Sequence, residues 1–134
     1  MTSAGVFGST SNVTKTVLPI IQKQDPIYLG KKTLVLDLDD TLVQSVQHKD
    51  TCKSVPIDFK VEVNLNRNAF IEILVYKRPG VDIFLNKMAK YFEIIIFTAS
   101  LNIYAEPVMA QLDTNGVCKT ILHRKHCELT SNGH

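Results

Sequence analysis

Three carboxylates directly follow a short apolar run in the segment Asp37-Leu38-Asp39-Asp40-Thr41. An ionised carboxylate can attack phosphorus directly and form an acyl phosphate, which water then cleaves. A second carboxylate nearby can protonate the leaving oxygen and afterwards accept a proton from that water. A neighbouring negative charge raises the pKa of a carboxyl group, which suits the acid in such a pair. Asp37 and Asp39 are therefore candidate catalytic residues for phosphoryl transfer, and a hard divalent cation would screen their charges.

A second polar group, Thr98-Ala99-Ser100, follows another apolar run and precedes a helical pattern. A hydroxyl group and free backbone N–H groups at a helix N-terminus can bind phosphate. The simpler alternative for this segment is a helix N-cap, worth about 1 kcal/mol. The simpler alternative for the aspartates is an acidic strand end that takes no part in catalysis. Ligands of open α/β sheets bind beyond the carboxyl ends of the strands. Two such strand ends in one chain therefore favour phosphoryl transfer.

Two short apolar runs, residues 33–38 and 92–97, must position these groups. Such runs are typical of strands buried on both faces of a parallel sheet. The polar stretch 44–54 between them is predicted to be a loop. Two alternating segments, 57–65 and 69–76, flank a turn and predict a β-hairpin.

The remaining periodicity predicts helices over residues 81–91 and 101–112, followed by a third strand over 117–122. Pro107 predicts that the second helix begins late or kinks, and Gly116 is expected to end it. This order of elements predicts an α/β fold with a hairpin inserted after the first strand.

The composition limits the class of protein. A chain of 134 residues with 45% apolar residues can form one folded domain, and a net charge of +2 is too small for an electrostatic nucleic-acid binder. No apolar run approaches the roughly 18–20 residues that span a bilayer. Cys52, Cys118 and Cys127 are too few and too widely spaced for a disulfide framework. We expect residues 1–30 to be a flexible N-terminal segment, either a tail or a segment that docks late, and residues 31–134 to form the domain.

Two further groups of residues are weaker candidates for a functional site, one for zinc and one for nucleic acid. Cys118, His123, His126 and Cys127 match no strong zinc template, and a solvated loop is the favoured interpretation. The basic pair Lys31-Lys32 and the basic residues 123–126 are weak candidates for a nucleic-acid site, because the net charge is small.

Residues 34–43 (LVLDLDDTLV), 77–81 (KRPGV) and 97–101 (FTASL), followed by Tyr104-Ala105 and Pro107, resemble the haloacid dehalogenase superfamily of aspartate-nucleophile phosphatases. Within it, the chain is similar to the FCP/SCP type that acts on the C-terminal domain of RNA polymerase II, which includes NLI-interacting-factor-like and Dullard-like proteins. The resemblance runs from about residue 32 to the end. It implies a parallel α/β sheet with a small β-hairpin insertion after the first strand, of which 31–134 would be the N-terminal part and the C-terminal part would be absent.

The resemblance implies a Mg²⁺-dependent phosphatase acting on phosphoserine or phosphothreonine in proteins. Asp37 would be the nucleophile and a Mg²⁺ ligand, and Asp39 would be the acid/base, with its backbone carbonyl on the metal. Thr41 would support the loop that carries the aspartates. Thr98, together with Ser100, would hold the phosphate.

Two further substrate contacts follow from the same resemblance. Arg124 matches a basic position that faces substrate, although it also suits a solvated basic loop. An apolar pocket for a proline near the phosphoserine would involve the hairpin, and ordinary hairpin packing is the equal alternative. The candidate pocket residues are Val61, Val63, Ile73 and Leu101. Gln47 departs from the apolar or aromatic residue that relatives often carry there.

The family's phosphate-binding lysine and its later metal carboxylates belong to a part of the pattern that follows Cys127, and the sequence ends at His134. The chain is therefore expected to be a fragment or a shortened phosphatase with impaired activity. The alternatives are an inactive module that binds phosphopeptides or a partner, and a small-molecule phosphatase. The small insertion favours a macromolecular substrate, such as the RNA polymerase II C-terminal domain. We expect self-association through a bare sheet edge, no direct nucleic-acid or membrane binding, and a location in the nucleus or cytoplasm.

Overall fold

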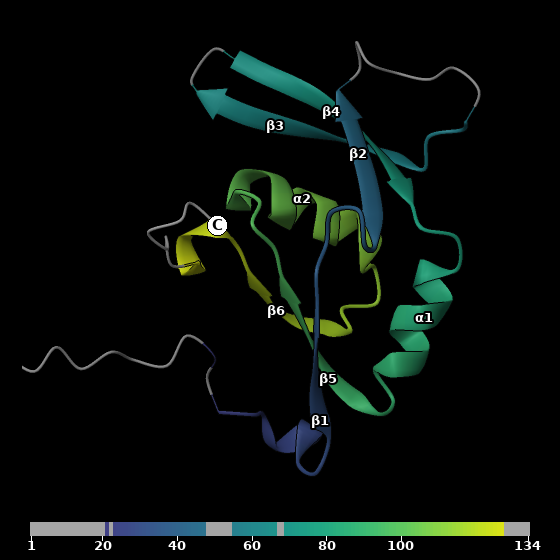
Figure 1. The fold of residues 1–134 in the computed structure, drawn as a ribbon, viewed down its shortest axis with the longest axis vertical. Coiled ribbons are helices and arrows are strands. Elements are labelled where there is room, and N and C mark those ends of the chain that lie inside the picture. Colours follow the sequence, from purple (N-terminus) through teal and green to yellow (C-terminus); the bar gives the residue numbers. More distant parts are fainter. Residues whose placement is uncertain (1–20, 22, 48–54, 67–68, 128–134) are drawn as a thin grey trace, which may run out of the picture.

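The computed structural model of the chain describes residues 21, 23–47, 55–66 and 69–127 (Figure 1). These residues form two three-stranded sheets with two α-helices, and short 3₁₀ helices at Pro26–Tyr28 and Arg124–His126. The elements follow one another along the chain as β1 (Lys32–Leu36), β2 (Val43–Gln47), β3 (Phe59–Asn66), β4 (Ala69–Lys77), α1 (Val81–Met88), β5 (Phe92–Phe97), α2 (Asn102–Leu112) and β6 (Cys118–Leu122).

The first sheet is parallel and has the strand order β1-β5-β6. Ile94 and Ile96 of β5 lie on one face of this sheet, since side chains alternate along a strand. Both are fully buried in one apolar cluster with residues of α1 and of α2, so the two helices cover the same face. Leu36 pairs with Ile96, which brings the carboxyl ends of β1 and β5 side by side. The predicted α/β fold is confirmed.

The prediction for β1 is only partly correct. The strand ends at Leu36 instead of residue 38, and it is not buried on both faces, because Val35 is 50% exposed. Within the described residues β1 pairs with β5 alone and lies at the sheet edge. The central strand β5, by contrast, has the predicted bounds and a fully buried middle.

The second sheet is antiparallel and has the order β2-β4-β3. The predicted hairpin is confirmed as β3 and β4, but residues 44–47 of the predicted loop belong to the strand β2, which begins at Val43. This strand lies at an edge and buries only Val43, so its sequence is polar and its pairing with β4 defines it. Residues 48–54 of the predicted loop lie outside the described residues. In Figure 1 this sheet lies above α2, and the first sheet lies below.

Both helices form within their predicted ranges. α1 is shorter than expected and ends at Met88, and Gly80 precedes it with a φ of +81°. α2 begins at Asn102 and continues across Pro107 to Leu112, so the late start is wrong, and the alternative of a kink at Pro107 stays a prediction. None of the helices in the described part of the chain combines the length and apolar character needed to cross a bilayer.

Part of the N-terminal segment packs against the first sheet. Tyr28 is buried, and Gln24 Nε2 donates hydrogen bonds of 3.0 Å to Lys31 O and to Glu93 Oε2. The predicted flexibility of residues 1–30 stays a prediction, since 1–20 and 22 lie outside the described residues.

Candidate functional site

The loop between β1 and β2 carries the three aspartates in a tight turn. The N–H groups of Leu42 and Val43 both donate to Leu38 O, at 2.9 and 3.2 Å, and Asp40 N–H donates to Val43 O at 2.8 Å. Leu38 is fully buried and anchors the turn in the core. Asp40 has a φ of +57°, a left-handed conformation that aspartate tolerates better than most residues.

Asp37 presents an exposed carboxylate at the end of β1. Its Oδ1 accepts a hydrogen bond of 2.8 Å from Leu38 N–H, and its Oδ2 accepts one of 3.2 Å from Thr41 Oγ1. Each bond uses one lone pair, so both oxygens keep accepting capacity that faces solvent. An exposed and oriented carboxylate is what a nucleophilic attack requires.

Asp39 is half-buried and faces the end of β5. Its Oδ2 accepts hydrogen bonds from Thr98 Oγ1 at 3.2 Å and from Ser100 Oγ at 2.7 Å. Its Oδ1 accepts one of 2.6 Å from the hydroxyl of Tyr104. The structure thus brings the acidic segment together with the Thr98-Ala99-Ser100 segment, as the sequence predicts.

Thr98 and Ser100 do not cap α2. Leu101 is the N-cap, and no side chain caps it. Thr98 is buried at 2% exposure, its N–H donates to Leu122 O at 2.9 Å, and its Oγ1 accepts from Ser100 N–H at 3.0 Å. The capping alternative is therefore wrong, and both hydroxyls serve the carboxylate of Asp39.

Sequence reasoning assigned no role to Tyr104. Its hydroxyl oxygen lies 2.5 Å from Ser45 Oγ on β2 as well as close to Asp39. The single phenolic proton goes to the carboxylate, so Ser45 is the donor to Tyr104. Burial raises the pKa of Tyr104 well above its usual value, and the hydrogen bond to Asp39 adds to this effect. Tyr104 therefore remains protonated and a donor at neutral pH.

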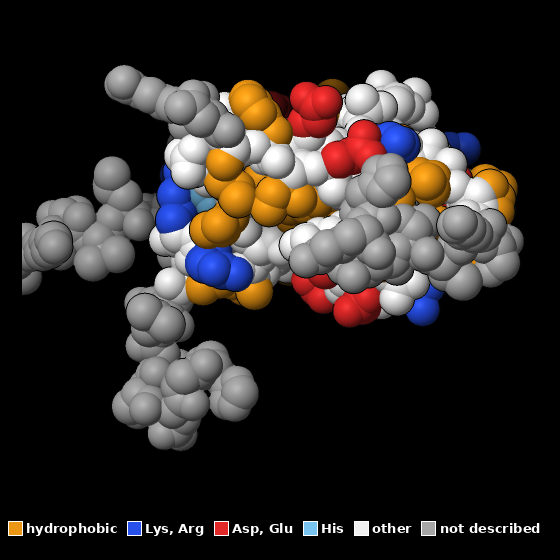
Figure 2. Space-filling model, turned by 90° about the horizontal axis from the view of Figure 1, so that it is seen from above, with side chains coloured by type: hydrophobic (Ala, Val, Ile, Leu, Met, Phe, Trp, Pro, Cys, Tyr) orange, Lys and Arg blue, Asp and Glu red, His pale blue; other side chains and the backbone are white. Residues whose placement is uncertain are grey.

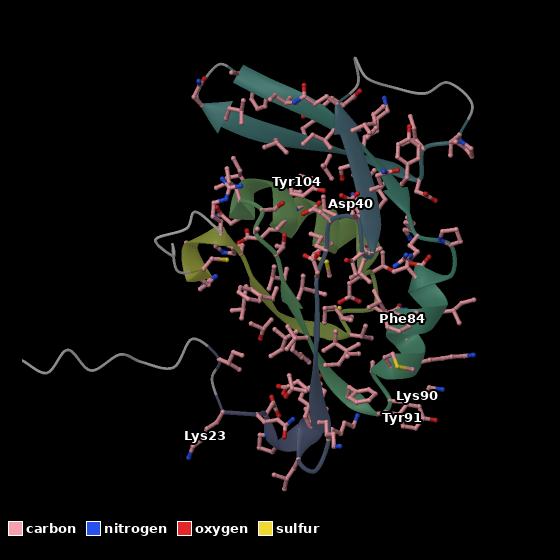
Figure 3. All side chains as sticks on the ribbon, viewed as in Figure 1. Lys23, Asp40, Phe84, Lys90, Tyr91 and Tyr104 are labelled. Atoms are coloured by element: carbon pink, nitrogen blue, oxygen red, sulfur yellow. The ribbon has the colours of Figure 1, made fainter. Side chains whose placement is uncertain are left out.

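The position of Tyr104 on α2 explains this contact. It lies in the first turn of the helix that follows Thr98, at the carboxyl ends of the strands, where Asp39 also lies. Figure 3 labels Tyr104 on α2 and Asp40 on the loop next to Asp39. A hydroxyl four residues after Ser100 was the available signal, but Tyr104 entered the prediction only within the helix 101–112 and among the residues that carry the resemblance.

Arg124 lies beside the same strand ends. Its main-chain N–H donates to Ser100 O at 2.9 Å, and its Nε donates to Ala99 O at 2.8 Å. The side chain is exposed, so the remaining guanidinium donors face solvent near Ser100. This placement is compatible with the predicted substrate contact.

The predicted apolar pocket on the hairpin does not form as an open surface. Val61 and Val63 are 5% and 4% exposed and belong to the core, which agrees with ordinary hairpin packing. Ile73 packs against the same core, while Leu101 is 44% exposed and Gln47 is exposed. On the described part of the face in Figure 2, apolar, acidic and basic side chains are intermixed.

The atoms of this site that could bind a metal ion are the carboxylate oxygens of Asp37 and Asp39. Mg²⁺ keeps several waters and is usually bound by one or two carboxylates together with substrate phosphate oxygens. The exposed carboxylate of Asp37 fits such an ion, while both oxygens of Asp39 are engaged by hydroxyls. No group of three or more His, Cys, Asp and Glu side chains in the described residues could hold a metal by itself. The same holds for the weak zinc candidates Cys118, His123, His126 and Cys127, all of which are described residues. The ring centroids of His123 and His126 lie 4.5 Å apart.

Comparison with protein families gives a match over most of the chain. The family of NLI interacting factor-like phosphatases matches residues 32–134. An uncharacterized protein of Schizosaccharomyces pombe is 45% identical over 111 residues, which cover 83% of this chain and 32% of that protein. The CTD nuclear envelope phosphatase 1 homolog of Drosophila melanogaster is 39% identical over 102 residues, covering 72% and 42%. The probable C-terminal domain small phosphatase of Dictyostelium discoideum is 41% identical over 114 residues, covering 82% and 34%.

Among solved structures, the RNA polymerase II CTD phosphatase Fcp1 of fission yeast, bound to beryllium fluoride, is similar with a TM-score of 0.60. The sequence identity is 20%, and the similarity covers 71% of this chain and 30% of that one. It confirms the haloacid dehalogenase-like fold expected from the sequence. The chain spans less than half of the length of each of these relatives.

Proposed function

The chain belongs to the family of NLI interacting factor-like phosphatases, and we propose that it hydrolyses phosphoserine or phosphothreonine in proteins through an aspartyl-phosphate on Asp37. One observation carries the proposal. An exposed, oriented carboxylate at the end of β1 lies next to a half-buried one, Asp39, that is hydrogen-bonded to Thr98 and Ser100 at the end of β5. Ligands bind at such paired carboxyl ends in parallel sheets.

The proposed reaction has two steps, and phosphorus is attacked first by Asp37 and then by water. An oxygen of Asp37 attacks phosphorus and the bond from phosphorus to the serine or threonine oxygen breaks. Asp39 gives its proton to that leaving oxygen. Water then attacks phosphorus, Asp39 takes a proton from it, and the bond from phosphorus to Asp37 breaks to release phosphate. Thr41 orients Asp37 throughout, and its hydrogen bond to Oδ2 supports that role.

The phosphate is proposed to bind between Thr98, Ser100 and Arg124. The two hydroxyls are donors at the strand end, and the guanidinium of Arg124 adds a positive charge next to Ser100. Mg²⁺, bound by Asp37 and the main-chain oxygen of Asp39, would supply neutralisation of the phosphate charge. Phosphate binding by Thr98 and Ser100 requires them to give up or share their hydrogen bonds with Asp39.

The proposed substrate is a protein, with the RNA polymerase II C-terminal domain as the first candidate. The similar solved structure is an RNA polymerase II CTD phosphatase, and two relatives are named as a CTD nuclear envelope phosphatase homolog and a probable C-terminal domain small phosphatase. The nuclear-envelope name also supports a nuclear location. Asp37 is exposed and the inserted sheet is small, so the site is open enough for a polypeptide. A small-molecule phosphatase is the alternative, and comparing kcat/KM on a phosphopeptide and on a small phosphate ester distinguishes the two.

Hydrolysis of a generic phosphate ester with Mg²⁺ tests the reaction. We expect phosphate release by the chain and none by Asp37→Asn, which keeps the size and the accepting oxygen of the side chain but not its charge. Asp58→Asn is a matched control, because it makes the same change at an aspartate of the second sheet, whose carboxylate accepts a hydrogen bond from Lys77 N–H. Equal rates with and without the Asp37 carboxylate would refute the proposal.

A binding module without catalysis is the second candidate. The three hydroxyls that engage Asp39 favour it, since such an arrangement also suits a rigid recognition surface. It predicts that the chain and Asp37→Asn bind a phosphopeptide equally well and that neither hydrolyses it. Binding measured by calorimetry, together with the hydrolysis assay, separates the two candidates.

A further inference from the structure

Arg78, the residue that follows β4, contacts the aspartate loop at two adjacent positions. Its main-chain N–H donates to Leu42 O at 2.9 Å, and its Nη1 donates to Thr41 O at 2.9 Å. Both bonds join the inserted sheet to the loop between β1 and β2. Neither contact involves a substrate-facing carboxylate.

The hydrogen bond from Nη1 holds the loop at Thr41, a residue whose own N–H is weakly bonded. Thr41 N–H lies 3.4 Å from Leu38 O, which is long for an N–H···O bond, whereas the next N–H, of Leu42, is 2.9 Å from the same oxygen. Thr41 is also the residue whose hydroxyl orients Asp37 Oδ2. The Thr41 carbonyl shares its peptide unit with Leu42 N–H, so Leu38 O and Arg78 hold this unit from its two sides, while Thr41 N–H itself is only weakly bonded.

Lys77, the basic residue next to Arg78, interacts with a carboxylate and not with the aspartate loop. Lys77 Nζ forms an ion pair of 2.8 Å with Asp82 at the start of α1. Arg78 makes no ion pair with any carboxylate in the described residues, and its side chain is exposed. The side-chain bond of Arg78 therefore goes to the main chain of the aspartate loop, at Thr41, and not to a carboxylate.

We propose that Arg78 is a positioning residue: its guanidinium holds the Thr41 carbonyl, and Thr41 in turn holds Asp37 in the orientation for attack. The inference rests on the proposed function for its catalytic consequence, but its structural part concerns the loop alone. A competing explanation exists, because Arg78, Thr41 and Tyr76 line an open cavity of about 300 Å³. A guanidinium at this cavity could contact substrate directly.

Two measurements on the full chain test the proposal. Hydrogen exchange follows the loop amides of Asp40, Leu42 and Val43, and steady-state kinetics on a generic phosphate ester gives kcat and KM. The variants are Arg78→Met, which removes the donors, and Arg78→Lys, whose ammonium can still donate to one carbonyl. Lys77→Met is the matched control, since it removes the adjacent charge and leaves the loop contacts in place.

In Arg78→Met we expect the loop amides to exchange about tenfold faster, with exchange in β5 unchanged. We expect kcat to fall about 10- to 100-fold, the loss that goes with a small misplacement of a reacting group, and KM to stay the same. Arg78→Lys should recover part of both losses, and Lys77→Met should behave as the unmodified chain. If Arg78→Met does not fold, Arg78→Lys is used instead, and its loop amide exchange, kcat and KM are compared with those of the unmodified chain.

Unchanged exchange of the loop amides in a folded Arg78→Met would overturn the proposal. A raised KM with an unchanged kcat would also overturn it, in favour of direct substrate contact. If the unmodified chain shows no hydrolysis that depends on Asp37, the proposed function fails, while faster exchange in Arg78→Met still supports Arg78 as the residue that holds the loop.

Discussion

Tyr104 donates a hydrogen bond of 2.6 Å to Oδ1 of Asp39, and it connects three elements that are separate in the sequence. The phenol comes from α2, the carboxylate from the loop after β1, and Ser45, which donates to the phenol, comes from β2. The candidate acid/base is thus held by the helix after β5 and, through Ser45, by the inserted sheet. A shift of the inserted sheet would act on Asp39 through this pair of bonds.

The variant Tyr104→Phe should destabilise the fold. Oδ1 of Asp39 has no other partner within the described residues, and the phenyl ring cannot donate to it. Hydrogen bonds to charged groups contribute more than neutral ones, so we expect a loss of about 2 kcal/mol in the free energy of unfolding. Urea denaturation followed by circular dichroism measures it.

Tyr91→Phe is the control for this variant, because Tyr91 is 67% exposed. A surface change of this kind should alter stability by no more than about 0.5 kcal/mol. Equal stability of the two tyrosine variants would show that the bond to Asp39 contributes nothing measurable to the fold.

The sequence predicted the parts of the site that depend on backbone topology. Asp39 meets Thr98 because β1 and β5 are parallel neighbours with Leu36 paired to Ile96, and a buried run such as FEIIIF is readable without tertiary information. The central position of β5 explains this, since its three consecutive isoleucines, Ile94, Ile95 and Ile96, are all buried although their side chains alternate between the two faces.

The missed features depend on what lies opposite each residue. β2 is polar because it is an edge strand, so residues 43–47 have no hydrophobic alternation that a sequence pattern could reveal. The role of Tyr104 depends on the direction in which α2 leaves the sheet. For Val61 the sequence left a substrate pocket and ordinary hairpin packing as equal alternatives, and Val61 lies in the core because β3 packs directly against α2.

A backbone prediction concerns Gly80, which precedes α1 with a φ of +81°. A Cβ at this position would meet no atom within 4 Å, so the cost of a side chain there is conformational and not steric crowding. We expect Gly80→Ala to lower the free energy of unfolding by about 1–2 kcal/mol. Gly80→Asn should cost less, since asparagine adopts left-handed conformations more readily. Thermal denaturation compares them, and an alanine variant as stable as glycine would contradict the prediction.

A third prediction concerns thiol reactivity. Burial raises the pKa of Cys118 to about 12, and the negative charge of Asp113, which also accepts hydrogen bonds from Val117 and Cys118 N–H groups, adds to this effect. The thiolate is the reactive form, so Cys118 should stay unreactive until the pH approaches 12. Cys127 is exposed and should react first. In a Cys52→Ser background, titration with a thiol reagent at pH 8 should label Cys127 quickly and Cys118 slowly, and equal rates would contradict the burial argument.

The last prediction concerns the edge strand β1. Within the described residues it pairs only with β5, and Val35 on it is 50% exposed, so its other edge offers backbone donors and acceptors to another chain. We expect the 134-residue chain to self-associate as its concentration rises in sedimentation velocity experiments. Val35→Lys should weaken association, because a charge on an edge strand opposes pairing. Ile83→Lys, on the exposed face of α1, is the matched control and should leave association unchanged. A monodisperse monomer at all concentrations, with a cooperative melt at high temperature, would show that this edge does not recruit a second copy.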